Sequence, residues 1–175
     1  LDMHLGTGDP DFASLMPNLM FLNRGGEQFI DVTMAGGFGH LQKGHGVSFA
    51  DLDNDGDVDL LEQMGGAFRG DEYADAVFEN PGFGNTWLGV KLEGRSANRS
   101  AIGARIRIAV KIGDAQRIYY RHIGSGGSFG ANPLRQTIGL GEAEEIAWCE
   151  VEWPSQSSTQ RVEFLPLNSY VHIVE

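Results

Sequence analysis

Hydrophobic and polar residues alternate with a period of two along much of the chain. In residues 104–112 every even position is apolar, whereas Arg105, Arg107 and Lys111 occupy odd positions. Residues 147–153 repeat this alternation. Because successive side chains of a strand point to opposite faces, both segments are predicted to be half-buried strands. Apolar residues at helical spacing are not sustained in any segment, so the pattern predicts an all-β protein.

Glycine-containing turn signals separate the predicted strands. Gly accounts for 25 of the 175 residues, about twice its usual share. Arg24-Gly25-Gly26, Asn80-Pro81-Gly82 and Gly113-Asp114 are typical sequences of tight turns. The remaining predicted strands are residues 18–23, 28–33, 47–52, 58–64, 86–92, 116–123, 134–139, 162–164 and 171–173.

The two halves of the chain differ in charge. Residues 1–85 hold 15 acidic and 3 basic residues, whereas residues 86–175 hold 9 acidic and 10 basic residues. Pro and Gly concentrate near the change, at residues 80–85. We therefore predict two domains, 1–85 and 86–175. A short similarity between residues 29–32 and 49–52 indicates that the first domain is built from repeated β-hairpins.

The composition argues against a nucleic-acid partner, a membrane-spanning helix and a disulfide within the chain. The net charge of −11 argues against nucleic acid as a partner. No apolar run approaches the roughly 20 residues that a membrane-spanning helix needs, so no membrane span is predicted. Cys149 is the only cysteine, which rules out a disulfide within the chain.

Five aspartates occupy alternate positions in one short segment of the first domain. Such a density of carboxylates is self-repelling unless a cation neutralises it, and a glycine within the segment permits a sharp turn. Carboxylate oxygens without His or Cys favour Ca²⁺ over transition metals. The predicted Ca²⁺ ligands are the side chains of Asp51, Asp53, Asp55 and Asp59 and the backbone carbonyl of Asp57.

The spacing of these acids also satisfies the EF-hand pattern, with Glu62 at the twelfth position. An EF-hand needs a helix before the loop, but residues 36–46 contain too many glycines to form one. We therefore expect the acidic segment to connect two strands. Glu62 is then a strand residue and at most a peripheral ligand.

Several motifs together resemble two known families. Gln28–Thr33 and Gly44–Asp57 are similar to the FG-GAP/VCBS repeat of integrin-type β-propellers. Asn98–Arg105, Gly124–Gly130, Gly139–Gly141 and Val151–Pro154, in that order, resemble the ASPIC/UnbV domain, which follows such repeats in the cartilage acidic protein family and its bacterial relatives.

The resemblance implies a propeller-type β-hairpin repeat with a calcium loop, followed by an antiparallel β-sandwich-like domain. It also implies a calcium-binding protein that is secreted or lies on the cell surface and has no established catalysis. We expect adhesion or ligand recognition, with an extracellular protein or a glycan as the ligand. Open strand edges favour a homo-oligomer. Too few repeats are present for a closed propeller, so further repeats are expected upstream.

Two alternative functions remain at this stage. A carbohydrate-binding module would use aromatic rings on an outer sheet face, and the alternation places Trp148 and Tyr119 on the polar sides of their strands. A hydrolase subunit would use His45 together with nearby carboxylates, but the alternation indicates no cleft. His40 and His45 flank a glycine-rich turn, where hydrogen bonding, a second metal site or acid–base chemistry are the alternatives.

Overall fold

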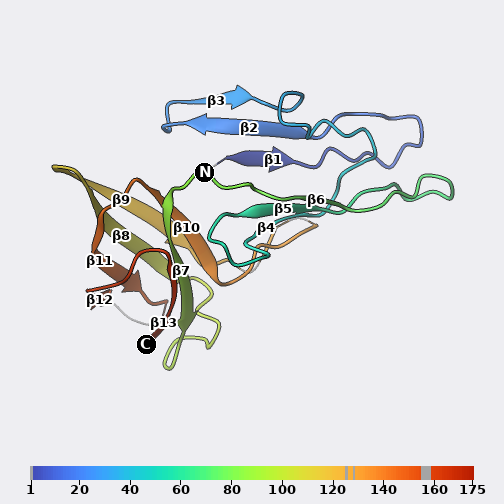
Figure 1. The fold of residues 1–175 in the computed structure, drawn as a ribbon. Coiled ribbons are helices and arrows are strands. Elements are labelled where there is room, and N and C mark those ends of the chain that lie inside the picture. Colours follow the sequence, from blue (N-terminus) through green and yellow to red (C-terminus); the bar gives the residue numbers. More distant parts are fainter. Residues whose placement is uncertain (1, 125, 128, 155–158) are drawn as a thin grey trace. The chain divides into compact units, whose positions relative to one another are not determined.

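The computed structural model describes residues 2–124, 126–127, 129–154 and 159–175. These residues form strands, turns and loops, and no helix occurs among them, so the predicted all-β class is confirmed (Figure 1). The described part of the chain therefore holds no helix that is long and apolar enough to cross a membrane. Ser125 and Ser128 of the Gly124–Gly130 motif lie outside the described residues.

Packing divides the chain into two compact units. We call one the N-terminal unit; it contains Leu1–Phe49, Leu60–Glu79 and Gly126–Ala131. The C-terminal unit contains Ala50–Asp59, Asn80–Ser125 and Asn132–Glu175. The acidic segment thus packs with the second half of the chain, although it precedes that half in sequence.

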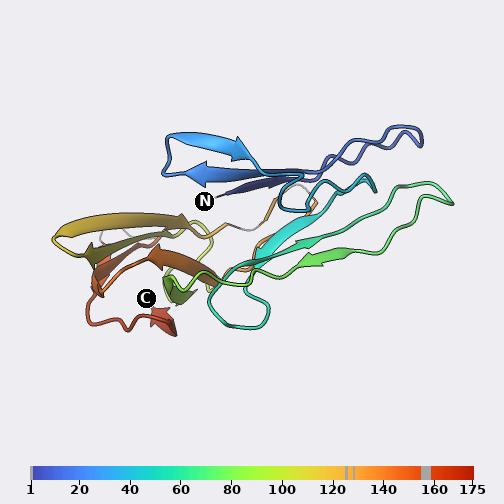
Figure 2. The same ribbon diagram turned by 45° about the horizontal axis from the view of Figure 1, so that its top comes forward.

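Two three-stranded antiparallel sheets build the N-terminal unit. Their strand orders are β1-β2-β3 and β4-β5-β6, and Figure 2 shows the hairpin of β2 and β3 in blue. Alternation did not predict β1 and β6, because three residues are too few to display a period. The strands are β1 (Met3–Leu5), β2 (Leu19–Arg24), β3 (Gln28–Asp31), β4 (Val47–Ala50), β5 (Asp59–Glu62) and β6 (Ala76–Phe78).

Buried polar side chains occupy much of the interior of the N-terminal unit. Nε2 of His4 lies 3.1 Å from Oε2 of Glu62, and both side chains are fully buried. The buried Lys43 ammonium donates to Oδ2 of Asp71 at 2.6 Å and to the backbone oxygen of Asp11 at 2.7 Å. Partners of this kind offset part of the cost of removing charged groups from water.

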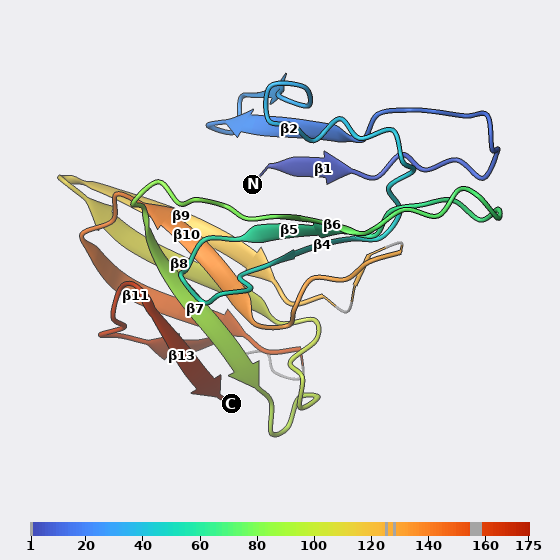
Figure 3. The same ribbon diagram turned by 45° about the vertical axis from the view of Figure 1, so that its right-hand side comes forward.

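Two sheets facing each other form the C-terminal unit. Their strand orders are β10-β7-β13 and β12-β11-β8-β9. Most pairs are antiparallel as predicted, but β13 runs parallel to β7, visible in Figure 3 as two arrows with the same direction. The strands are β7 (Thr86–Glu93), β8 (Arg105–Ile112), β9 (Ala115–His122), β10 (Gln136–Gly141), β11 (Glu145–Glu152), β12 (Thr159–Val162) and β13 (Ser169–Val174).

The apolar faces of these two sheets share one hydrophobic core. Leu88 and Val90 of β7 contribute from one sheet, and Ile106 and Ile108 of β8 contribute from the other. Trp153 is almost completely buried and donates its indole N–H to Oε1 of Gln160 at 2.8 Å. The two sheets of the C-terminal unit are therefore held together by one continuous apolar core.

Candidate metal centre

The acidic loop, residues 51–58, connects β4 to β5. Both neighbouring elements are strands, as predicted, so the segment lacks the flanking helices of an EF-hand. Asn54 and Gly56 have φ values of 65° and 99°, which turn the chain sharply within the loop. A Cβ atom built on Gly56 would lie 2.0 Å from the Trp87 indole, so glycine is required here for space as well as for conformation.

Three of the predicted ligands come together in this loop. Asp51, Asp53 and Asp55 each offer a carboxylate oxygen, and these oxygens all lie within 4.8 Å of one another. Asp51 is buried, whereas Asp53 and Asp55 are exposed. The arrangement offers one cation three oxygen ligands from alternate positions of a tight turn.

Hydrogen bonds from the loop backbone orient these carboxylates. Oδ1 of Asp53 accepts from the amide of Asp55 at 3.2 Å, and Oδ1 of Asp55 accepts from the amide of Asp57 at 2.9 Å. Oδ2 of Asp51 accepts from the amide of Gly56 at 3.0 Å. Each bond leaves at least one lone pair of its carboxylate for a cation.

Oδ1 of Asp51 is the observation that most favours a cation. This oxygen is buried and has no hydrogen-bond partner, and the exposed fraction of the whole residue is only 6%. A buried charged oxygen without a partner is costly, and native structures rarely leave one unsatisfied. A Ca²⁺ ion among the three carboxylates would satisfy it, so the residues fit the metal that the sequence predicts.

Asp57 and Asp59 lie outside this group of three. Both oxygens of the buried Asp59 accept backbone amides, from Leu52 and Asn80, each at 2.9 Å. Asp59 therefore holds the two ends of the loop together. Burial raises the pKa of the Asp57 carboxyl, and the negative charges of its aspartate neighbours raise it further. Ligation by Asp59 and by the Asp57 carbonyl stays a prediction.

Three side chains from the second half of the chain anchor the loop. The alternation of hydrophobic and polar residues did not identify them as part of the site. The Tyr170 hydroxyl of β13 donates to Oδ2 of Asp51. The Trp87 ring lies 5.0 Å from the Tyr170 ring, centre to centre, and faces Gly56. The Arg135 guanidinium lies 4.2 Å from the Tyr170 ring centre and donates to Oδ1 of Asn54 at 2.8 Å.

The other residues proposed from the sequence lie elsewhere in the two units. Glu62 pairs with His4 in the N-terminal unit. His40 makes an edge contact with the Phe78 ring, and the His45 ring packs at 6.1 Å from the Phe129 ring. Neither histidine joins the group of metal-capable side chains found in the described residues.

The predicted orientation of Tyr119 is wrong. Its ring packs against the sandwich core and its hydroxyl donates to the backbone oxygen of Leu140 at 3.1 Å. Its neighbour Tyr120 is the exposed one. Trp148 is half-buried, on the side of its strand opposite to the core residue Cys149, and the Arg161 guanidinium lies 5.0 Å from its ring centre.

Comparison with known proteins finds two families within the chain. Residues 5–62 match an FG-GAP-like repeat. Residues 94–175 match the ASPIC and UnbV family. The order of the two matches is the one that the sequence motifs predicted, and the acidic loop falls within the first match. No curated protein matches this chain.

Proposed function

Because this chain carries an FG-GAP-like repeat followed by an ASPIC and UnbV domain, we propose that it is a non-catalytic calcium-binding β-protein that serves adhesion or ligand recognition outside the cell. Asp51, Asp53 and Asp55 would hold the ion. The buried, unpartnered Oδ1 of Asp51 is the single observation that carries this proposal.

Calcium fits the donor set better than other common cations. The grouped ligands are carboxylates, which are hard oxygen donors, and Ca²⁺ completes its shell with backbone oxygens and water in flexible geometries. Mg²⁺ demands near-ideal octahedral geometry and gives up water reluctantly, so a loop of three convergent carboxylates favours it less. The ion would supply positive charge and would thereby stabilise the loop.

The role of the ion in this proposal is structural. The loop lies against Trp87, Tyr170 and Arg135, so an ion that orders the loop also orders its contacts with the sandwich. Extracellular calcium modules typically bind with Kd values of about 10⁻⁴–10⁻³ M. At about one to ten times Kd, calcium adds roughly 0.4–1.4 kcal/mol to the free energy of unfolding.

Thermal unfolding with calcium and with a chelator tests this proposal. We expect chelation to lower Tm by about 1–5 °C, which is what such a free energy gives for a chain of this size. Asp55→Ala should remove most of the difference, whereas Glu142→Ala, at an exposed acid outside the loop, should preserve it. Equal Tm values for calcium-loaded and demonstrably metal-stripped protein would contradict the proposal.

A further inference from the structure

β9 is the longest edge strand of the C-terminal unit. It ends the strand order β12-β11-β8-β9 and has eight residues, whereas the other edge strands, β10, β12 and β13, have six, four and six. Its pairing with β8 runs from Ala115 to His122 without a bulge. A long and regular edge of this kind is a template on which a further strand can pair.

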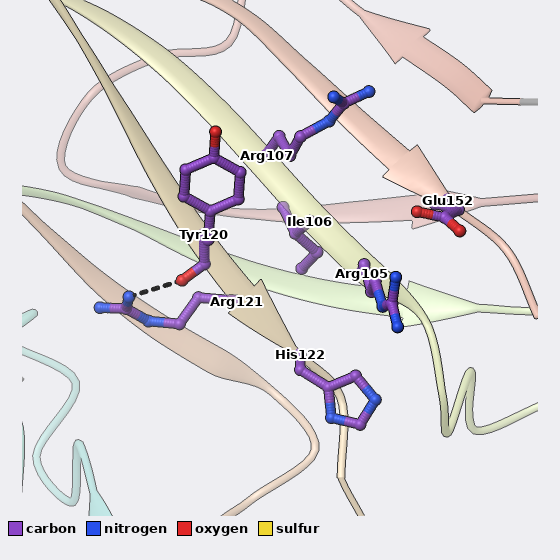
Figure 4. Close-up of a pocket in the computed structure, with 7 residues that line it drawn as sticks. All are labelled: Arg105, Ile106, Arg107, Tyr120, Arg121, His122 and Glu152. Carbon is purple, nitrogen blue, oxygen red and sulfur yellow. Dashed lines mark hydrogen bonds between the residues drawn. The ribbon is translucent and has the colours of Figure 1, made fainter.

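The pairing of β9 shows which of its backbone groups point to the open edge. The amide of Ile123, just after β9, donates to the oxygen of Ala104 at 2.9 Å, so the odd-numbered residues point toward β8. Neighbouring residues of an antiparallel strand direct their backbone groups to opposite sides, so the even-numbered residues, 116 to 122, point outward. Among the described residues, no backbone bond outside the β8–β9 pairing reaches them. One side chain does, because Nη1 of Arg121 donates to the backbone oxygen of Tyr120 at 2.8 Å, the dashed line in Figure 4.

The side chains of β9 make this edge basic. The strand holds Arg117, Arg121 and His122 and no acidic residue. Arg117 stands opposite the buried Val110, and Arg121 lies on the same face of the strand four residues later. Arg117 is exposed and Arg121 is half-buried, so solvent reaches this face along the edge. In the part of the chain that the structure describes, neither arginine forms an ion pair.

The opposite face of β9 offers apolar surface to an added strand. Ile118 and Tyr120 have exposed fractions of 41% and 63%, and Ile118 stands opposite the buried Ala109. Large side chains at alternate positions of an edge strand contact the residues opposite them on a neighbouring strand. A strand that fits β9 therefore carries acids on one face and apolar side chains on the other.

The charges on β9 disfavour a second copy of the same strand. When two β9 strands overlap in antiparallel pairing, each arginine comes opposite or diagonal to an arginine of the other copy, and like charges so placed are destabilising. An acidic strand turns the same charges into attraction. Burial lowers the pKa of the Arg121 guanidinium, which nevertheless stays charged at neutral pH. A partly desolvated cation without an acidic partner gains more from a carboxylate than a fully hydrated one does.

We propose that the open edge of β9 binds an extended acidic segment of a partner protein as an added antiparallel strand. The backbone of that segment pairs with the even-numbered residues of β9. Two of its carboxylates, four residues apart, meet the guanidinium groups of Arg117 and Arg121. Arg121 then leaves the Tyr120 oxygen to an amide of the added strand. The inference rests on the ligand-recognition part of the proposed function and makes no use of the calcium loop.

Titration of the protein with synthetic heptapeptides, followed by amide NMR at one fixed calcium concentration, tests the inference. In acetyl-TEVTVET-amide, the glutamates stand opposite the two arginines when the valines stand opposite Ile118 and Tyr120. The control acetyl-TVETEVT-amide has the same composition and charge, but it can place only one glutamate opposite an arginine. We expect the first peptide to shift the amide signals of β9 and to bind at least about fivefold more tightly than the control. Equal affinity of the two peptides would overturn the proposed charge match.

Methylation of single backbone amides in acetyl-TEVTVET-amide separates strand addition from simple charge attraction. The amide of the first valine points toward β9 in this pairing, whereas the amide of the central threonine points away from it. A methyl group on the valine amide removes a hydrogen bond to β9 and should weaken binding about tenfold. The same methyl group on the threonine amide should leave the affinity unchanged. Equal affinities of the two methylated peptides would overturn strand addition.

Arginine variants of the protein locate the site. Arg117→Gln/Arg121→Gln should weaken binding of acetyl-TEVTVET-amide about tenfold. Lys91→Gln/Arg99→Gln is the matched control, because it removes the same charge from two exposed residues on β7 and in the loop after it. This control should bind as the wild type does. Undiminished binding by the double arginine variant would overturn the site.

The protein without peptide tests the alternative occupant of the edge. Its β9 amide signals should not change with protein concentration. If they change, and the peptide does not bind, the edge belongs to a second copy of the chain and the proposal is overturned. Calcium titration is a separate readout, so this proposal and the metal centre can fail independently.

Discussion

The Tyr170 hydroxyl donates a hydrogen bond to Oδ2 of Asp51, a residue 119 positions earlier in the chain. This bond joins the last strand of the sandwich to the first carboxylate of the acidic loop. It occupies one oxygen of Asp51 and leaves the other, Oδ1, buried and available. Tyr170 is therefore a positioning residue for the proposed metal centre.

Tyr170→Phe removes this hydrogen bond and keeps the ring that packs against Trp87 and Arg135. Partners that orient a metal ligand typically contribute about 10–100-fold to metal affinity, so we expect calcium affinity to fall about tenfold. Calcium titration of the metal-stripped variant measures the change. Tyr120→Phe removes a hydroxyl from an exposed tyrosine outside the loop and serves as the control. Unchanged affinity in Tyr170→Phe would show that the hydroxyl does not position Asp51.

Gly56→Ala should destabilise the protein more than a simple turn substitution does. Its new methyl group would collide with the Trp87 indole, and φ is 99°. Gly70→Ala is the matched control, since φ is 92° there and a methyl group at that position would meet no atom within 4 Å. Backbone strain costs about 1–2 kcal/mol at both sites, and the collision adds about 1–3 kcal/mol at Gly56. Denaturant unfolding of both variants measures how far each lowers the free energy of unfolding. The two losses should be equal if the loop does not contact Trp87.

Cys149 should be inert in the folded protein. Burial raises the pKa of its thiol to about 12, and the neighbouring Glu150 carboxylate contributes to this rise. Because only the thiolate reacts, an aromatic disulfide reagent at pH 8 should leave the native thiol unmodified and modify it fully after unfolding. As the pH rises toward 12 the native thiol should begin to react, provided that the fold persists. Rapid reaction of native protein at pH 8 would place Cys149 outside the core.

Alternation predicted most strands of the C-terminal unit, because one face of such a strand packs on the sandwich core. Tyr119 shows where that signal fails. β9 is an edge strand whose residues are mostly exposed on both faces, so its own sequence does not mark an inner side. Pairing with β8 decides the matter, since Tyr119 stands opposite the buried Ile108 and Tyr120 stands opposite Arg107. The register between two strands depends on the tertiary fold, so the hydrophobic pattern within one strand cannot predict it.

The acidic loop was predictable from local spacing, whereas its anchors were not. Asp51, Asp53 and Asp55 converge because a tight turn brings alternate positions together. Trp87, Arg135 and Tyr170 come from three separate segments, and each looks like an ordinary residue of its own segment. Only the packing of the C-terminal unit assembles them around Asn54 and Gly56.

Calcium titration of metal-stripped protein by calorimetry tests the central claim most directly. We predict that about one ion binds per chain, with a Kd of about 10⁻⁴–10⁻³ M. Asp53→Asn should weaken this binding without unfolding the protein, because it removes one of three negative charges at an exposed residue, whereas Glu142→Gln should bind as the wild type does. Absence of calcium binding by the wild type, or equal binding by Asp53→Asn, would contradict the proposed metal centre.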